Sequence, residues 1–217
     1  LSVLRMESAR NRLLDCISIL SRQLVMAPTQ RCLLNEISST LQAVSPATLE
    51  VTLPSISIPR LNGSPLFFIP IAESPSMHCS IFGFRNAGDV IPMHDHPLMH
   101  GFIRVLRGSL RVTSFSTLSN AHHPHSVRFN GVREVSARDG CIYLSPDRDN
   151  IHQVSALEDG TFFFDLLIPG YKEVSCSYFE LPHPLPAEGS EIQLRRCSTP
   201  DSYSCITLPY DTLHYEE

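Results

Sequence analysis

The feature that most limits the fold of this chain is a series of short β-type segments that follows Pro46. These segments are rich in Val, Ile, Phe and Thr, and clusters of Gly, Pro, Asn and Asp separate them. Such a pattern is typical of an antiparallel sandwich or barrel. No helical pattern alternates with the segments, which argues against a doubly wound α/β fold. The expected strands are residues 66–72, 78–85, 100–106, 109–116, 132–136, 141–145, 151–156, 161–168 and 203–208.

The segment before Pro46 has a different periodicity. From Ser8 to Val44 apolar residues recur at helical spacing, and Pro28 divides the run into two amphipathic helices. Helices of this kind typically pack on one face of a larger body. The organisation that we expect is one domain over residues 1–217, with 8–44 helical, 117–131 as a long loop and 181–202 as a Pro-rich surface segment.

Composition excludes several classes of protein. The 217 residues, 42% of them hydrophobic, can form one substantial core. A net charge of -5 without a dense Lys/Arg run predicts no nucleic-acid or membrane partner, and the apolar stretches are too short for a membrane span. Seven cysteines without a CxxC pair favour reduced thiols. The chain starts at Leu1, which suggests trimming, and shows no signal-peptide core. We expect a cytoplasmic monomer.

A pair of histidines provides the main functional signal. His94 and His96 are two residues apart, so an extended strand would place both imidazoles on one face and Asp95 on the other. Two imidazoles facing a barrel interior can share a divalent ion, whereas without a metal they would be buried polar groups that need separate partners. An isolated His-x-His is weak, because surface segments produce it by chance.

The glycines around this pair strengthen the signal. The spacing matches that of the first cupin motif: Gly88, five residues, the His-x-His pair, four residues, Gly101 and then Gly108. A second block resembles the second cupin motif, with one extra residue before its histidine and with alanine at the usual asparagine position. Its residues are Gly140, Pro146, His152 and Ala156. The sequence therefore predicts a cupin barrel with metal ligands His94, His96 and His152.

The acidic ligand of the first motif would fall at Gly101, so the expected site lacks a carboxylate. Three neutral imidazoles leave a divalent ion with its full charge and about three open positions, which favours an anionic ligand such as a thiolate. Imidazoles alone do not select iron over zinc, copper or nickel. Zinc hydrolysis or isomerisation, and a ligand-binding barrel with a structural metal, remain alternatives.

The segment Ile91–Gly101, continuing through Arg104–Gly108, resembles the cysteamine dioxygenase and plant cysteine oxidase family. The resemblance extends to Ile151–Val154 and to Phe164–Tyr171, and it covers roughly residues 66 to 180. Position 98 is Leu where the family often has glycine, which predicts a narrower loop beside the metal.

This resemblance implies a mainly β fold, a cupin (double-stranded β-helix, jelly-roll-like) barrel with the N-terminal helices packed on it. It also implies Fe(II) and the addition of both atoms of O2 to a thiol sulfur, which gives a sulfinate. Family substrates are cysteamine and cysteine at protein N-termini, the latter as an oxygen-dependent degradation signal.

Three further residues are candidates for catalysis. Asp165 lies in an apolar strand, where it can meet a substrate ammonium or orient a histidine, or form a purely structural hydrogen bond. Tyr171 is expected near the barrel mouth and His100 near the ligands, although packing explains either residue as well.

The other histidines and cysteines receive plainer interpretations. Cys176 and Tyr178 match a Cys-x-Tyr pair that resembles one able to form a thioether crosslink in some animal members, but an inert cysteine is the simpler expectation. The remaining expectations are solvent exposure for His122, His123 and His125, and core positions for Cys79 and Cys141.

Overall fold

The computed structural model describes residues 8–53, 64–118, 125–171 and 175–210, and it begins with two helices. Helix α1 spans Ala9–Met26 and α2 spans Arg31–Gln42, so the predicted break at Pro28 is confirmed. Ser8 caps α1, since its hydroxyl accepts the Asn11 N–H at 3.2 Å. Neither helix is both long enough and apolar enough to cross a membrane.

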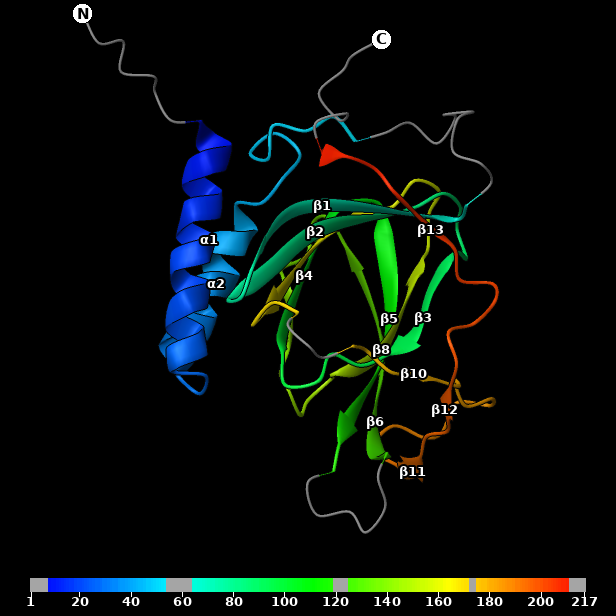
Figure 1. The fold of residues 1–217 in the computed structure, drawn as a ribbon. Helices are drawn as coiled ribbons and strands as arrows, with labels where there is room; N and C mark the ends of the chain where they lie inside the picture. Colours follow the sequence, from blue (N-terminus) through cyan, green and yellow to red (C-terminus); the bar gives the residue numbers. More distant parts are fainter. Residues whose placement is uncertain (1–7, 54–63, 119–124, 172–174, 211–217) are drawn as a thin grey trace, which may run out of the picture.

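Two sheets form the body of the protein (Figure 1). The first has the order β13-β1-β2-β9-β4-β7, in which all pairs except β13–β1 are antiparallel. Its strands are β1 (Leu66–Ser74), β2 (Met77–Phe84), β4 (His100–Arg107), β7 (Ile142–Leu144), β9 (Phe162–Ile168) and β13 (Cys205–Thr207).

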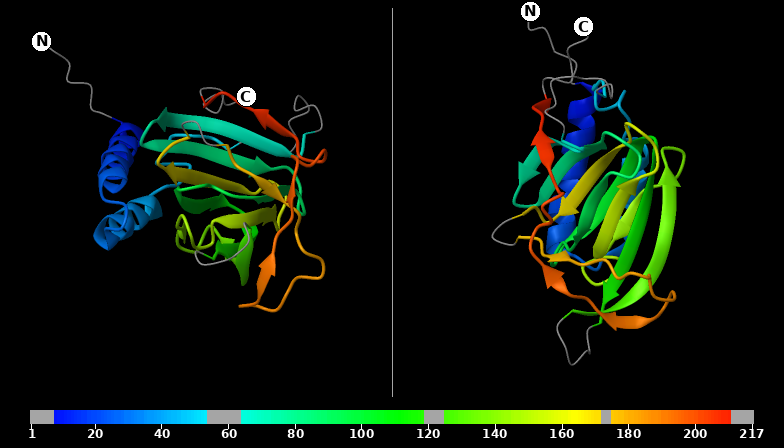
Figure 2. Two further views of the ribbon diagram at one scale, coloured as in Figure 1. Left: turned by 60° about the horizontal axis from the view of Figure 1, so that its bottom comes forward. Right: turned by 90° about the vertical axis from the view of Figure 1, so that its right-hand side faces the viewer.

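The second sheet has the order β11-β6-β5-β8-β3-β10-β12. Its strands are β3 (Val90–His94), β5 (Ser109–Thr117), β6 (Ser126–Ser136), β8 (Ile151–Ala156), β10 (Tyr178–Phe179), β11 (Glu191–Gln193) and β12 (Arg196–Cys197). From β2 to β5 and again from β6 to β10, consecutive strands alternate between the two sheets, and the sheets curl around a common interior (Figure 2). This is the predicted mainly β, double-stranded β-helix barrel with helices packed on it.

Strand alternation separates two apolar layers. One face of the first sheet packs against both helices, which cover it from outside (Figures 1 and 2). The other face points into the barrel, where it meets the second sheet. Strand β9 serves both layers and is buried along its whole length, with Phe164 and Leu166 toward the helices and Phe163 inside the barrel.

Three sequence-based expectations need correction. The loop expected over residues 117–131 is too long, because β6 begins at Ser126 and its alternating Val127 and Phe129 are buried. The segment 181–202, expected to be irregular, contributes β11 and β12. Strand β3 was not among the predicted strands; it contains a β-bulge between Ile91 and His94, which local periodicity does not reveal.

Candidate metal centre

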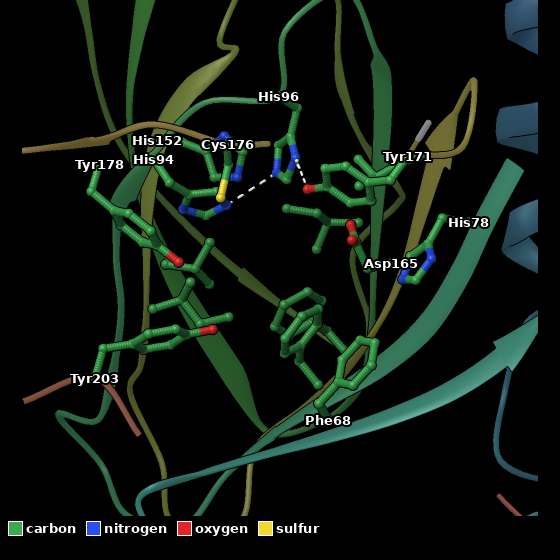
Figure 3. A pocket seen from close by; sticks show the side chains of 16 residues that line it. Phe68, His78, His94, His96, His152, Asp165, Tyr171, Cys176, Tyr178 and Tyr203 are labelled. Atoms are coloured by element: carbon green, nitrogen blue, oxygen red, sulfur yellow. Dashed lines mark hydrogen bonds between the residues drawn. The ribbon is translucent and has the colours of Figure 1, made fainter. Parts of the chain in front are cut away.

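The structure brings His94, His96 and His152 together at the inner end of a pocket in the barrel (Figure 3). Their candidate ligand nitrogens all lie within 4.8 Å of one another. His94 ends β3 and pairs across the sheet with His152 of β8. The bulge in β3 turns Met93 away from the pocket, into an apolar cluster with Phe115 and Ile151. It leaves Ile91 and His94 both facing the pocket.

His96 corrects one expectation, because it follows the strand instead of belonging to it. The chain leaves the sheet at Asp95, whose carboxylate accepts the Ser177 N–H at 2.6 Å and whose own N–H donates to the Ser177 carbonyl at 3.1 Å. The imidazoles of His94 and His96 still converge as expected. They do so because the chain turns after His94, and not because both residues share one strand face.

The nitrogens of the cluster have assigned roles. His94 Nδ1 lies 2.8 Å from the Pro92 carbonyl, and His152 Nδ1 lies 3.2 Å from the Asn150 carbonyl. Because a carbonyl only accepts, each Nδ1 carries the ring proton and each Nε2 keeps its lone pair. His96 Nδ1 lies 2.9 Å from the Tyr171 hydroxyl, a partner that can accept in the same way.

Burial keeps the three rings neutral. They are 8%, 7% and 2% exposed in sequence order. Desolvation lowers the pKa of His94, and together with the neighbouring histidines it lowers the pKa of His96 well below the usual value. The pKa of His152 falls to about 3, mainly through desolvation and then through His94. Neutral imidazoles are the form that binds a metal.

The cluster fits a divalent ion. The Nε2 atoms of His94 and His96 are 3.0 Å apart, and two lone pairs at that distance repel unless a cation lies between them. Two nitrogens bound at right angles, each about 2.1 Å from one ion, would be about 3 Å apart. At Gly101, where the first cupin motif has its acidic ligand, an added Cβ would meet Leu144 Cδ1 at 3.0 Å.

Asn150 is a supporting residue that the sequence did not reveal. Its Oδ1 accepts the backbone N–H of His96 at 2.9 Å, and its Nδ2 donates to the His96 carbonyl at 2.8 Å. The side chain is 3% exposed. The asparagine of the second cupin motif would follow His152, at position 156, whereas Asn150 precedes His152, so the motif does not identify it.

The pocket has a volume of about 210 Å³ and a graded lining. The histidine cluster, Asp165 and buried aliphatic side chains line its inner part, and half-buried aromatic residues line its rim. The rim residues are Phe68, His78, Phe82, Tyr171, Tyr178 and Tyr203, together with Cys176. Of these, Phe68, His78, Phe82 and Tyr203 were not predicted.

Asp165 faces this pocket from β9. Among the described residues no side chain pairs with its carboxyl group. Desolvation raises its pKa to about 7. A carboxyl group of this kind is costly in an apolar wall without a ligand, and it charges readily when a cation approaches.

His100 lies elsewhere. It is absent from the pocket lining and shares a sheet face with Phe102, which packs toward the helices. Its Nδ1 lies 2.8 Å from the Tyr143 hydroxyl, a residue packed against the same layer. The expectation that His100 works beside the ligands is therefore not supported by its position, because strand alternation turns it outward.

Leu98 does not narrow the pocket. Its side chain is 77% exposed and its φ is 63°, so the residue points to solvent from a left-handed turn. His125 is exposed as expected and packs on Phe179, while His122 and His123 lie outside the described residues. Cys79 is fully buried and Cys141 partly buried against the helix-facing layer.

Barrel and cluster together define a cupin-class protein with a candidate three-histidine metal site in an aromatic-rimmed pocket. The family model described as PCO_ADO matches residues 52–213, and the chain belongs to this family.

Curated relatives agree with this assignment. The 2-aminoethanethiol dioxygenase of Mus musculus is 30% identical over 186 residues, which cover 70% of this chain and 72% of that protein. The Homo sapiens protein of the same name is 28% identical over 69% of this chain and 68% of its own. Among solved structures, KdgF from Halomonas sp. is similar with a TM-score of 0.39 and 18% identity over 50% of this chain and 83% of that one.

Proposed function

We propose that this protein is an Fe(II)-dependent thiol dioxygenase that adds both atoms of O2 to a thiol sulfur. The observation that carries the proposal is the separation of charges in the pocket. Three neutral imidazoles would hold the metal without a carboxylate, and Asp165, the one carboxyl group that the described residues contribute to the lining, stands apart from them. The full charge of the ion is then left for a thiolate, and the carboxylate is left for an ammonium group.

The reaction balances without a reductant. A thiolate and O2 combine to give a sulfinate, in which the sulfur has lost four electrons and each oxygen atom has gained two. When bound, ferrous iron supplies the unpaired electrons that O2 requires for reaction with a closed-shell thiolate. The protein contributes orientation, since substrate and oxygen meet in one small pocket.

The chain's own residues have distinct tasks in this scheme. Asp165 binds the substrate ammonium and thereby directs the sulfur toward the histidine cluster. Ile91, Ile103 and Val154 line the inner part of the pocket and exclude water from it. Tyr171, whose hydroxyl lies 2.9 Å from His96 Nδ1, holds that imidazole in its orientation.

Two substrates suit the pocket. A volume of about 210 Å³ accepts a small aminothiol such as cysteamine, the substrate named for the relatives. It also accepts the first residue of a Cys-initiated chain whose remainder leaves over the rim. The proposal includes oxidation of N-terminal cysteine as a means of oxygen sensing. It also includes a cytoplasmic location and a monomeric state for the protein.

The test is direct. Protein loaded with Fe(II) under nitrogen and then exposed to O2 should add two oxygen atoms to cysteamine or to a Cys-initiated peptide, as measured by mass spectrometry. His152→Ala should bind iron weakly and lose this activity, and His183→Ala, a change at an exposed histidine, should lose neither. Undiminished oxidation by His152→Ala would disprove the assigned site. Activity on another substrate with zinc and without O2 would favour the hydrolytic alternative.

A further inference from the structure

His78 is a half-buried polar residue to which the proposed reaction assigns no role. It projects from β2 into the pocket, where Figure 3 shows it beside Asp165 and Tyr171. Its ring stacks on Phe68, with centroids 5.9 Å apart and planes 4° apart, and meets the edge of Tyr171 at 5.7 Å. Two aromatic contacts therefore fix the plane of the imidazole.

Neither ring nitrogen of His78 has a hydrogen-bond partner among the described residues. Nδ1 is buried, whereas Nε2 remains accessible. Burial lowers the pKa of His78, so the ring is neutral and carries one proton. A buried N–H without an acceptor is rarer and costlier than a buried lone pair, which assigns the proton to Nε2. His78 thus presents an unused donor to the pocket.

The register places this donor next to Asp165. In the β2–β9 pair, Ser80 lies opposite Asp165 and His78 lies opposite Leu167. His78 and Asp165 are therefore diagonal neighbours on one sheet face. Their Cα atoms are about 7–8 Å apart in this arrangement, a distance that a ligand can bridge. Ser80 is fully buried and does not line the pocket, so among the described residues on this face of β2, His78 is the donor that a ligand held by Asp165 can reach.

We propose that His78 is a specificity-determining residue, which donates a hydrogen bond to the carbonyl oxygen of the first residue of a Cys-initiated chain. This inference rests on the proposed function in taking Asp165 as the ammonium contact. In such a chain the ammonium nitrogen and the carbonyl carbon share one Cα, so the carbonyl oxygen is roughly 3 Å from the nitrogen. Cysteamine has no carbonyl group and gains nothing from His78.

The experiment compares two small ligands, cysteinamide and cysteamine, of which only cysteinamide carries a carboxamide group and with it this carbonyl oxygen. Calorimetry under nitrogen with the Fe(II)-loaded protein gives a Kd for each. We expect wild-type protein to prefer cysteinamide by about tenfold, the value of one hydrogen bond in an apolar pocket. His78→Phe should reduce this preference to about one, and His78→Gln, which keeps a donor, should retain part of it.

The controls separate recognition from folding and from catalysis. His78→Phe removes an unpaired buried nitrogen, so its Tm should not fall, and His183→Phe makes the same change at an exposed site without altering the preference. Equal binding of the two ligands by wild-type protein, or an unchanged preference in His78→Phe, would overturn the inference. Absence of oxygen uptake with the preference intact would refute the proposed function and leave His78 as the carbonyl contact.

Discussion

Asn150 holds both backbone polar groups of His96, with its Oδ1 2.9 Å from the N–H and its Nδ2 2.8 Å from the carbonyl oxygen. His96 lies outside any strand, so no ladder of hydrogen bonds fixes its backbone. The amide of Asn150 replaces that ladder, and its own backbone carbonyl orients His152. One residue thus positions two of the three candidate ligands.

Asn150→Ala should therefore weaken metal binding without removing a ligand. Loss of a residue that supports metal ligands typically costs 10- to 100-fold in affinity, and we expect a decrease of about that size in competition titration with Fe(II). Asn86→Ala, in an exposed turn, is the matched control. An Asn150→Ala protein with wild-type iron affinity would show that His96 needs no such support.

Asp165→Asn should change the pH dependence of stability. Since burial raises the pKa of Asp165 from 3.8 to about 7, the folded chain keeps a proton that the unfolded chain has released in this range. Stability of the wild-type protein therefore falls as pH rises from about 4 to about 7, and then levels off. The variant avoids this loss, so its advantage should grow over the same window to at most about 4 kcal/mol.

Urea unfolding at a series of pH values measures this difference for the metal-free protein. Asp201→Asn changes an exposed carboxyl group and should show no such growth. A constant difference between Asp165→Asn and wild type across the window would mean that the buried carboxyl group has a partner.

Leu98→Gly should stabilise the protein. A non-glycine residue in the left-handed region costs about 1–2 kcal/mol, and glycine adds about 0.5–1 kcal/mol of backbone entropy cost on folding. The exposed side chain contributes little packing, so a net gain of about 0.5–1 kcal/mol and a Tm higher by a few degrees are expected in thermal unfolding. Leu185→Gly, an exposed leucine without a positive φ, should instead lower the Tm.

Thiol reactivity should separate the cysteines by burial. Cys16 and Cys32 are exposed on the helices, whereas Cys79 is fully buried and burial raises the pKa of its thiol. A thiol reagent should modify Cys16 and Cys32 in the folded protein, and Cys79 only in denaturant, as peptide mapping would show. Rapid labelling of Cys79 would indicate that the helices detach from the sheet.

Sequence patterns predicted the helices and most strands because these elements depend on local periodicity. Ile17 and Leu24 recur at helical spacing, and both are buried against the sheet. Spacing also identified the three histidines, because glycines at turns fix where a motif can begin and end. These parts of the structure are encoded within short stretches of chain.

The rest depends on pairing between distant strands. His78 and Asp165 become neighbours only through the β2–β9 register, and Tyr203 reaches the pocket through a segment that follows twelve strands. The sequence does not predict that His100 faces away from the pocket, because a shift of one residue along the strand moves a side chain to the other face of the sheet. Such relationships require the register, which a single sequence does not specify.

Strand β9 carries a consequence for how this protein can evolve. One face of the strand supports the helical layer, and the other supplies Asp165 and part of the pocket wall. Each of its seven residues is therefore buried against one layer or the other. A substitution that improves substrate fit also shifts the support beneath the helices. New specificities should therefore arise at the rim, on Phe68, Tyr178 or Tyr203, while β9 stays nearly unchanged among descendants of this chain.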